Sequence, residues 1–563
     1  MRRLERFYRL GYTFEGNLGR HIYAPLRSPD SIRLINVQPG DPGSGVECEL
    51  LTTRLQGAPM YQALSYCWGD PTRTQLIKCN GQDFAVTKNL YDALSRLRDS
   101  HEQRTMWIDA ICINQRDYAE RNRQLLLMRN IYQKAKQVAV WIGKEADTIG
   151  AVQFMLRTLR EIGKRANGIV HLEPTAANLE SLGLPEQTSP AWSALRYFFR
   201  RPWFERVWVI QEAVNASDLQ VMCGQQSFEW EDIAYAARCI ADSPMFATTD
   251  TAHICRHIRF IDQCRQKFRQ SRSDQEQLAL LDLLYGSRRC DASDQRDKIY
   301  GLYPLIESLS KLPSPDYAKP VDTIYRETAA HIIGRTGKLD VLRFAGAARH
   351  PRTRSLNLPS WVPDWHSHDR ATSLAEIFRS QTRRAEVSFS SSLDAITVKG
   401  TVLDEVASLS DTIQPFQGSI NGERVDWAFL DWPNGRVRLE PTGEEVNIID
   451  VVLHSLLSHG LDRDSRLLPT SLIKGDARTT RNNAMKLLYG RRVFRSSSGR
   501  LGLISSYATT RDRIALFSGA GVPFVIRSTG SSSYNLIGEC FLAGFMGEMH
   551  LTCAEEEREI TLK

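Results

Sequence analysis

The sequence has no long hydrophobic run and no paired-cysteine motif. No stretch approaches the roughly 18 apolar residues of a membrane-spanning helix, and apolar runs such as 138–143 have the length of strands. The 11 cysteines are odd in number and scattered, without a Cys-x-x-Cys pair, so a reducing compartment is expected rather than a disulfide framework. Residues 1–16 lack the apolar core of a signal peptide. We therefore expect a cytoplasmic protein without a membrane span.

The sequence also has little excess of charge of either sign. The 72 Lys and Arg against 65 Asp and Glu leave a net charge of +7 over 563 residues. Basic clusters at 265–272 and 491–495 are mixed with polar and apolar residues, whereas a nucleic-acid site concentrates basic charge on one face. We expect no nucleic-acid partner. The 42% hydrophobic and 24% charged residues are typical of globular proteins, and the length predicts about three or four domains.

Several motifs of enzyme chemistry are missing. The sequence contains neither a Gly-x-Gly-x-x-Gly or Walker phosphate loop nor a Gly-x-Ser-x-Gly nucleophile motif. His253, Cys255, His257 and Cys264 form a metal-like cluster. On a helix, however, Cys255 would point away from the two histidines, and two ligands do not make a zinc site. We expect no metal and no resident cofactor.

The first part of the chain alternates between strand and helix patterns. Residues 1–30 are read as a lead-in. Strands are expected at 32–51 (two, around a Gly/Pro-rich turn), 61–66, 105–113 and 137–142, helices at 89–98, 117–136 and 148–162, and a loop at 165–190. Such alternation predicts an α/β domain, residues 31–228, with a parallel sheet covered by helices on both faces.

The remaining chain changes character twice. Residues 229–345 are predicted to be mostly helical and residues 346–563 β-rich, with a small barrel or sandwich at the end. The clearest helices are expected at 276–285 and 322–333, a helical interruption at 448–458, and short strands at 395–402, 492–494, 514–517, 522–526 and 534–539. In the α/β part, Asp117 and Glu120 have the spacing of a capping box at the start of the 117–136 helix.

Four segments of the α/β part stand out together, and a fifth follows. They are Ala63-Leu-Ser-Tyr-Cys-Trp-Gly-Asp70, Trp107-Ile-Asp-Ala-Ile-Cys-Ile-Asn-Gln115, the helix beginning at Glu120-Arg121, Val138-Ala-Val-Trp-Ile-Gly143, and Arg201-Pro-Trp-Phe-Glu-Arg-Val-Trp-Val-Ile-Gln-Glu212. In this order they resemble the heterokaryon incompatibility (HET) domain of filamentous fungi. The resemblance implies a role in nonself recognition and programmed cell death, with self-association or another incompatibility protein as the partner.

A second resemblance concerns mechanism. The order of a strand with Ser-Tyr, a helix, a strand ending in Ile-Asp, a helix, a Val-rich strand and a helix with Trp-x-x-x-Glu is similar to a TIR domain, which has a flavodoxin-like fold. Some TIR domains cleave NAD with a glutamate on that last helix, and Glu212 in Trp208-Val-Ile-Gln-Glu212 stands at the matching place. The resemblance thus implies NAD as a substrate and Glu212 as the catalytic residue.

One carboxylate suffices for this chemistry, because nicotinamide is already cationic and leaves without protonation. A nearby carboxylate stabilises the positive charge of the ribosyl transition state. Glu212 is the candidate for that role, and Trp208, four residues earlier on the same helix face, is a candidate wall against a ring. The alternative is a structural one, in which Glu212 forms an ion pair with Arg206 or Arg201 and fixes the helix.

Polar and aromatic residues follow two of the predicted strands. Tyr66, Trp68, Asp109, Asn114 and Gln115 would lie at the carboxyl ends of strands, where ligands bind in open α/β sheets. Their side chains could contact ribose hydroxyls or stack on a base. The alternative is that Asp109 and Asn114 only cap the turn that follows.

Two functional hypotheses remain open. In the first, the head hydrolyses NAD when a partner or self-association assembles the site. In the second, the chain is a non-enzymatic signalling module that acts through HET-domain association. Whether the protein is an enzyme is left open by the sequence. The Glu120-Arg121 pair could orient the loop after Asn114 or meet a partner domain, and it is interpreted as a helix-start carboxylate and a solvated arginine rather than a catalytic pair.

Overall fold

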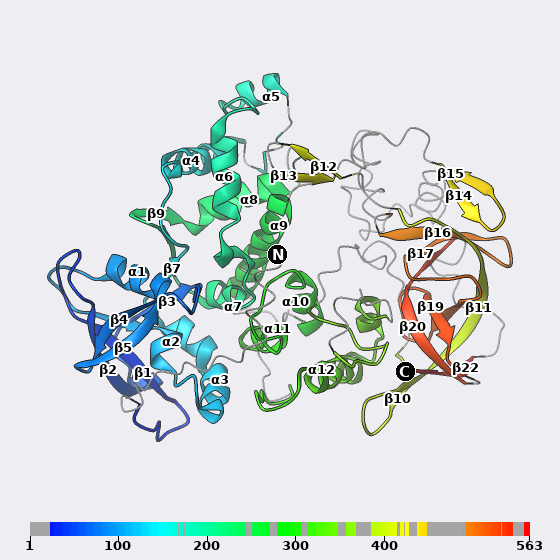
Figure 1. The fold of residues 1–563 in the computed structure, drawn as a ribbon, viewed down its shortest axis with the longest axis horizontal. Helices are drawn as coiled ribbons and strands as arrows, with labels where there is room; N and C mark the ends of the chain where they lie inside the picture. Colours follow the sequence, from blue (N-terminus) through cyan, green and yellow to red (C-terminus); the bar gives the residue numbers. More distant parts are fainter. Residues whose placement is uncertain are drawn as a thin grey trace. The chain divides into compact units, whose positions relative to one another are not determined.

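The computed structural model describes most of the chain as two compact units, residues 1–318 and 319–563 (Figure 1). The helical stretch predicted at 229–345 is divided between them. The described residues are 23–166, 168–170, 172, 175–241, 243, 250–270, 279–306, 312–346, 356–366, 384–413, 417–420, 423–426, 436–447, 488, 490–530, 532–543 and 557–563.

The first unit, the head, contains a nine-stranded sheet in the order β5-β4-β2-β1-β6-β3-β7-β8-β9. Strands β6, β3, β7 and β8 are parallel neighbours at its centre. Numbered along the chain, these four central strands have the order 2-1-3-4. The strands of the sheet are β1 Ser31–Val37, β2 Glu47–Arg54, β3 Gln62–Tyr66, β4 Thr74–Cys79, β5 Gln82–Thr87, β6 Arg104–Trp107, β7 Gln137–Trp141, β8 Leu219–Cys223 and β9 Gln226–Glu229.

The predicted parallel sheet is confirmed for the four central strands, whereas the sheet as a whole is mixed. Two-residue turns join β4 to β5 and β8 to β9, a longer loop at 38–46 joins β1 to β2, and all three pairs are antiparallel. The β4–β5 hairpin was missed. Its turn residues Asn80 and Gly81 both have positive φ, at 51° and 74°, which is the backbone of a two-residue hairpin turn. The Asn-Gly pair was the sequence signal for it.

Helices follow the central strands as predicted, with two differences. The strand expected at 105–113 ends at Trp107, and Asp109 begins the short helix α2, where its carboxylate accepts from the backbone N–H of Ala110 at 2.7 Å. The loop expected at 165–190 contains α5. The helices of the head are α1 Lys88–Leu97, α2 Asp109–Cys112, α3 Tyr118–Lys134, α4 Ile149–Ala166, α5 Ala176–Ser181, α6 Pro190–Phe199, α7 Trp208–Asn215, α8 Trp230–Ala241, α9 Asp250–Gln270, α10 Leu280–Gly286 and α11 Asp297–Tyr300.

The start of α3 confirms half of the capping box. Asp117 is the N-cap and accepts from the Glu120 N–H at 3.0 Å. The Glu120 carboxylate does not bond back to Asp117. It is buried and binds Arg33 of β1 at 2.6 and 3.0 Å, and it accepts from the N–H of Asn114. Glu120 is therefore a helix-start carboxylate as predicted, and it is buried because β1 brings the guanidinium of Arg33 beside it.

Opposite faces of the central strands contact different helices. Side chains alternate along a strand, so Ser65 and Tyr66 of β3 point to opposite faces. Trp141 is in register with Tyr66 and donates to Asn89 of α1 at 3.0 Å, which places α1 on the Tyr66 face. Ser65 contacts Glu212 of α7, and α7 packs beside α3. The head is thus an α/β unit with helices on both faces of its parallel strands.

The second unit begins with α12 (Val321–Thr336) and continues as an 11-stranded sheet around one long strand, β11 (Ile396–Ser410). Strand β11 pairs with both β18 and β22, and β18, β19, β20 and β22 pair in sequence. These pairings close a five-membered ring, so the β-rich prediction is confirmed and takes the form of a barrel. The other strands are β10 Val387–Phe389, β14 Arg436–Glu440, β15 Glu444–Asn447, β16 Arg491–Ser496, β17 Leu501–Ser505, β18 Arg513–Phe517, β19 Phe524–Ser528, β20 Ser533–Glu539, β21 Phe541–Leu542 and β22 Arg558–Leu562.

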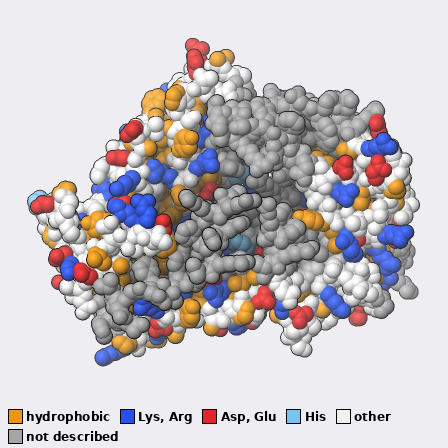
Figure 2. All heavy atoms as spheres, viewed as in Figure 1, with side chains coloured by type: hydrophobic (Ala, Val, Ile, Leu, Met, Phe, Trp, Pro, Cys, Tyr) orange, Lys and Arg blue, Asp and Glu red, His pale blue; other side chains and the backbone are white. Residues whose placement is uncertain are grey.

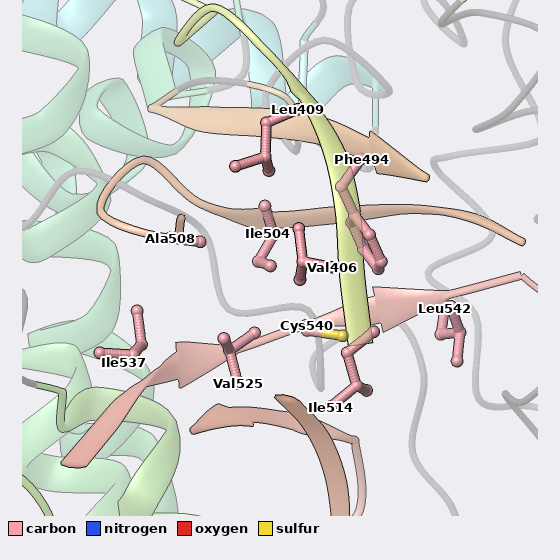
Figure 3. Packing of buried hydrophobic residues seen from close by; sticks show 10 residues of the cluster. All are labelled: Val406, Leu409, Phe494, Ile504, Ala508, Ile514, Val525, Ile537, Cys540 and Leu542. Atoms are coloured by element: carbon pink, nitrogen blue, oxygen red, sulfur yellow. The ribbon is translucent and has the colours of Figure 1, made fainter. Parts of the chain in front are cut away.

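Buried apolar side chains from these strands form the core of the second unit (Figure 3). Phe494, Ile504 and Ile514 meet Val406 of β11 there, and each is at most 1% exposed. The strand β11 bends at the bulge between Val402 and Asp404, which lets one strand pair along both sides of the unit. A separate hairpin contains β12 (Gln417–Ile420) and β13 (Glu423–Asp426). The helical interruption predicted at 448–458 lies outside the described residues.

Basic and acidic side chains are interspersed on the described part of the face in Figure 2. Within the described residues, no helix combines the length and apolar character needed to cross a bilayer.

Candidate functional site

The carboxyl ends of β3 and β6 bring three of the predicted site residues together. Strand β3 ends at Tyr66, which is buried, and Trp68 follows on the loop with 42% of its surface exposed. The indole N–H of Trp68 donates to Asp109 Oδ2 at 2.9 Å, just beyond the end of β6. An exposed indole is therefore held in place by a carboxylate at the sheet edge where ligands bind in open α/β folds.

Arg206 lies against the same edge. Its guanidinium donates to the backbone carbonyl of Tyr66. Burial lowers the pKa of Arg206, but the neighbouring Cys67, Glu212 and Asp109 outweigh that effect, so the pKa is raised. Arg206 thus remains a fixed positive charge among groups that can become negative.

Glu212 of α7 is buried, with 4% of its surface exposed. The Ser65 hydroxyl donates to Glu212 Oε2, and the Trp203 indole N–H donates to the Ser65 oxygen at 2.8 Å. Burial raises the pKa of Glu212 from 4.5 to about 7, although Arg206 and the Ser65 hydrogen bond oppose the rise. The carboxyl group therefore exchanges a proton near neutral pH, and its one side-chain hydrogen bond comes from Ser65, whose hydroxyl is itself fixed by Trp203.

The groups around Glu212 influence one another electrostatically. Burial raises the pKa of Asp109, and Arg206 and the Trp68 hydrogen bond oppose this rise. Burial likewise raises the pKa of Tyr66, with Asp109 adding to the effect. Two carboxyl groups, a phenol and a guanidinium therefore form one electrostatically coupled site at the end of β3.

Arg201, the other candidate partner of Glu212, lies at the next strand. Its guanidinium donates to the backbone carbonyl of Ile142 at 3.0 Å, directly after β7. It therefore fixes the end of that strand.

Gln115 and Asn114 contribute in different ways. The Gln115 side-chain amide donates to the backbone carbonyl of Asp109 at 2.9 Å, so it joins the Trp68–Asp109 group. The Asn114 side chain accepts from the N–H of Arg116 at 3.2 Å. Asn114 thus shapes the turn before α3, and its side-chain contact is local to that turn.

Trp208 contacts a different cluster. Its indole N–H donates to Asp297 Oδ2 at 3.0 Å, and the Tyr317 hydroxyl donates to Asp297 Oδ1 at 2.6 Å. Trp208 and Glu212 lie one turn apart on α7, but their polar partners come from different parts of the chain. Ser65, Trp203 and Asp297 were not among the predicted site residues, since no local pattern joins residues so distant along the chain.

The metal-like cluster on α9 is a buried contact of another kind. His257 Nε2 lies 3.3 Å from Cys290 Sγ, and burial lowers the pKa of His257 to about 4. Among the residues that the structure describes, no group of three or more His, Cys, Asp and Glu side chains is arranged to hold a metal ion.

Two family models match the chain. One, described as heterokaryon incompatibility protein (HET), matches residues 61–212, and the other, described as Het-6 beta-barrel domain, matches residues 472–562. The chain is a fungal HET-domain protein. The HET match covers β3 to the middle of α7 and ends at Glu212 itself. The barrel match contains β16 to β22, whereas β11, which completes the ring of strands, precedes it.

A curated relative matches this HET-domain protein over both units. Heterokaryon incompatibility protein 6, OR allele, of Neurospora crassa is 28% identical over an alignment of 411 residues, and the match covers 62% of this chain and 60% of the relative. The chain thus spans about three fifths of the length of that relative. No solved structure matches.

Proposed function

We propose that this HET-domain protein acts in fungal nonself recognition and triggers programmed cell death through NAD hydrolysis in its head. The recognition role is supported by the HET match and by the relative's name, a heterokaryon incompatibility protein. The site would act in the cytoplasm, and its partner would be a second copy of the chain or another incompatibility protein. The observation that carries the chemistry is the buried Glu212 carboxyl group, whose pKa is raised to about 7.

A flavodoxin-like, TIR-like architecture of the head is part of the proposal. Its support is the 2-1-3-4 order of β3, β6, β7 and β8, which is the order of the first four strands in flavodoxin-like sheets. In such sheets the ligand binds between the two neighbouring strands at which the strand order reverses, which are β3 and β7 here. Tyr66 ends β3 and accepts from Arg206, which supports this location, while Trp68 bonds to Asp109 after β6, on the other side of β3.

The reaction needs one carboxylate in its anionic form. The bond from the ribose carbon to the nicotinamide nitrogen breaks, and its electron pair neutralises the pyridinium, which leaves as neutral nicotinamide. Glu212 would stabilise the positive charge on the ribose until water attacks that carbon, giving ADP-ribose and one released proton. Ser65 and Trp203 would hold the carboxylate, Trp68 would stack on a ring, and Asp109 and Gln115 would contact hydroxyl groups.

The ionisation of Glu212 sets the expected pH dependence. The anion is the active form, so the rate should rise with pH through about 7, the value to which burial raises the pKa of Glu212. Arg206 favours the anion, because its fixed positive charge opposes the effect of burial.

The test is NAD consumption and nicotinamide release by the purified full chain, alone and tethered into an oligomer. Glu212→Gln should abolish turnover, whereas Glu145→Gln, which removes an exposed glutamate of the same unit, should retain it. Circular dichroism confirms that both variants fold. Intact NAD with the wild-type chain in every assembled state would refute the enzymatic proposal.

A non-enzymatic signalling module remains the second candidate. The second unit follows the head in the sequence and has its own closed ring of strands. Such a unit could serve as a recognition or assembly domain. Cell killing by Glu212→Gln at the wild-type level would favour this function over NAD hydrolysis.

A further inference from the structure

The helix that carries Glu212 begins without a side-chain cap. The residue before α7, Val207, makes no side-chain capping bond. Instead its N–H donates to the backbone carbonyl of Asp291 at 3.0 Å, and the Asp291 N–H donates in turn to the carbonyl of Glu205 at 2.6 Å. A segment about 80 residues further along the chain therefore binds the start of α7, where unpaired backbone groups are normally satisfied by a local cap.

Asp297, from the same distant segment, binds the first residue of α7. Its carboxylate is 8% exposed and accepts from Trp208 at 3.0 Å through one oxygen and from Tyr317 at 2.6 Å through the other. Burial and the nearby Asp294 raise the pKa of Asp297 to about 6, while the two donors and Arg121 oppose the rise. Both hydrogen bonds favour the charged carboxylate, which makes them stronger than bonds between neutral groups.

Tyr317 is fixed from several sides. The guanidinium of Arg121, on α3, lies 4.1 Å from the centre of the Tyr317 ring, and that of Arg296 lies 5.4 Å from it. Asn122 accepts from the Tyr317 N–H at 3.3 Å. The chain from α11 to Tyr317 is thus bound to α3 and, through Asp297, to α7.

These contacts lie outside the part of the chain that the HET model matches. The match ends at Glu212, whereas Asp291, Asp297 and Tyr317 come later and belong to the same compact unit. Trp208 and Glu212 are four residues apart on α7, so a rotation of the helix that releases the indole also moves the carboxylate.

We propose that Asp297 is a positioning residue for Glu212, acting through Trp208, and that the working head extends to at least Tyr317. Asp297 does not touch Glu212. It fixes the rotation of α7, which brings the Glu212 carboxylate to Ser65. This inference rests on the proposed catalytic role of Glu212, since positioning matters only if that carboxylate reacts.

Two substitutions separate positioning from general stability. Trp208→Phe keeps an aromatic ring but removes the donor to Asp297 from α7. Tyr317→Phe removes the other donor to the same carboxylate and leaves the bond to α7 intact. Because misplacing a reacting group by about 1 Å costs about 100-fold in rate, Trp208→Phe should lower kcat about 10-fold or more, with KM within about twofold of wild type, and Tyr317→Phe should lower kcat much less.

The closing experiment measures NAD turnover by the full chain and, in parallel, the infrared band of the Glu212 carboxyl group. That band is assigned by its loss in Glu212→Gln, and its pH midpoint is followed in each variant. The proposal predicts a midpoint shift of about half a pH unit or more in Trp208→Phe and a smaller one in Tyr317→Phe. Adding Asp297→Asn to Trp208→Phe should have little further effect on kcat or on the midpoint.

NAD turnover and the infrared midpoint test the proposed function and the positioning role separately. If the wild-type chain leaves NAD intact, the proposed function fails, and the infrared midpoints still decide whether Asp297 positions Glu212. Equal effects of Trp208→Phe and Tyr317→Phe on kcat and on the midpoint would overturn the inference. So would a Trp208→Phe variant in which KM alone changes, because that result assigns Trp208 to substrate contact.

Discussion

The buried carboxyl group of Glu212 makes a quantitative prediction about stability. Its pKa rises from 4.5 to about 7 on folding, a rise of about 2.5 pH units, which at about 1.4 kcal/mol per unit amounts to about 3 kcal/mol. Since the side chain is 4% exposed, solvent screening reduces this figure little. Glu212→Gln replaces the group with a neutral side chain of the same shape that can still accept from Ser65.

The sign follows from proton binding. A carboxyl group whose pKa is raised in the folded state favours folding while it is protonated, and this contribution is lost as pH rises through the folded pKa. The free energy of unfolding of the wild type should therefore fall relative to Glu212→Gln as pH rises from about 4.5 to about 7, by about 3 kcal/mol in total. Any fixed cost of placing an amide at this position is the same at every pH and cancels from the comparison.

Urea unfolding, measured from pH 4 to 8 for both proteins in parallel, tests the prediction. Tryptophan fluorescence reports mainly on the head, because among the described residues four of the five tryptophans below 2% exposure belong to residues 1–318, namely Trp107, Trp192, Trp203 and Trp230. A difference between wild type and Glu212→Gln that stays constant across this pH range would refute the reasoning. It would mean that Glu212 ionises as freely in the folded head as in the unfolded chain.

Two further predictions concern other buried contacts. Arg33→Met or Glu120→Gln breaks an ion pair whose side chains are 1% and 4% exposed. Either substitution should therefore lower the free energy of unfolding by about 3–5 kcal/mol in urea titrations. A loss below about 1 kcal/mol would contradict this prediction. Gly502→Ala would place a Cβ 2.1 Å from the carbonyl oxygen of Phe541, which should cost about 1–3 kcal/mol and speed proteolysis of the second unit. Gly334→Ala, in α12 with open space around it, is the matched control and should stabilise by about 1 kcal/mol.

Local sequence patterns predicted many elements of the head. The alternation of apolar strands with helices located β3, β7, α1, α3 and α4 to within a few residues. Asp117 marked the start of α3 because an N-cap is recognised by its own side chain and the N–H three residues later. The prediction failed where a strand pattern continued past a turn: Trp107 ends β6, and the apolar residues after it belong to α2.

The environment of the candidate site could not be read from such patterns. Ser65 and Glu212 are 147 residues apart in sequence, and Trp203 and Ser65 are 138 apart. The burial of Glu120 could not be predicted, since nothing near it in the sequence reveals that β1 brings Arg33 beside it. A buried carboxylate and an exposed one have the same local sequence signal, because burial depends on which other segments cover the residue.

The sequence by itself determined the family, the alternation of strands and helices in the head, and the place of Tyr66, Trp68 and Asp109 at the ends of strands. Motifs and hydrophobic periodicity involve residues close together along the chain, so they can be recognised in a single sequence. Only the tertiary structure decided that the head sheet is mixed, that β11 closes a ring of strands, and that Asp297 binds the helix of Glu212. These features depend on contacts between distant segments, whose stability comes from desolvation and packing that no local pattern encodes.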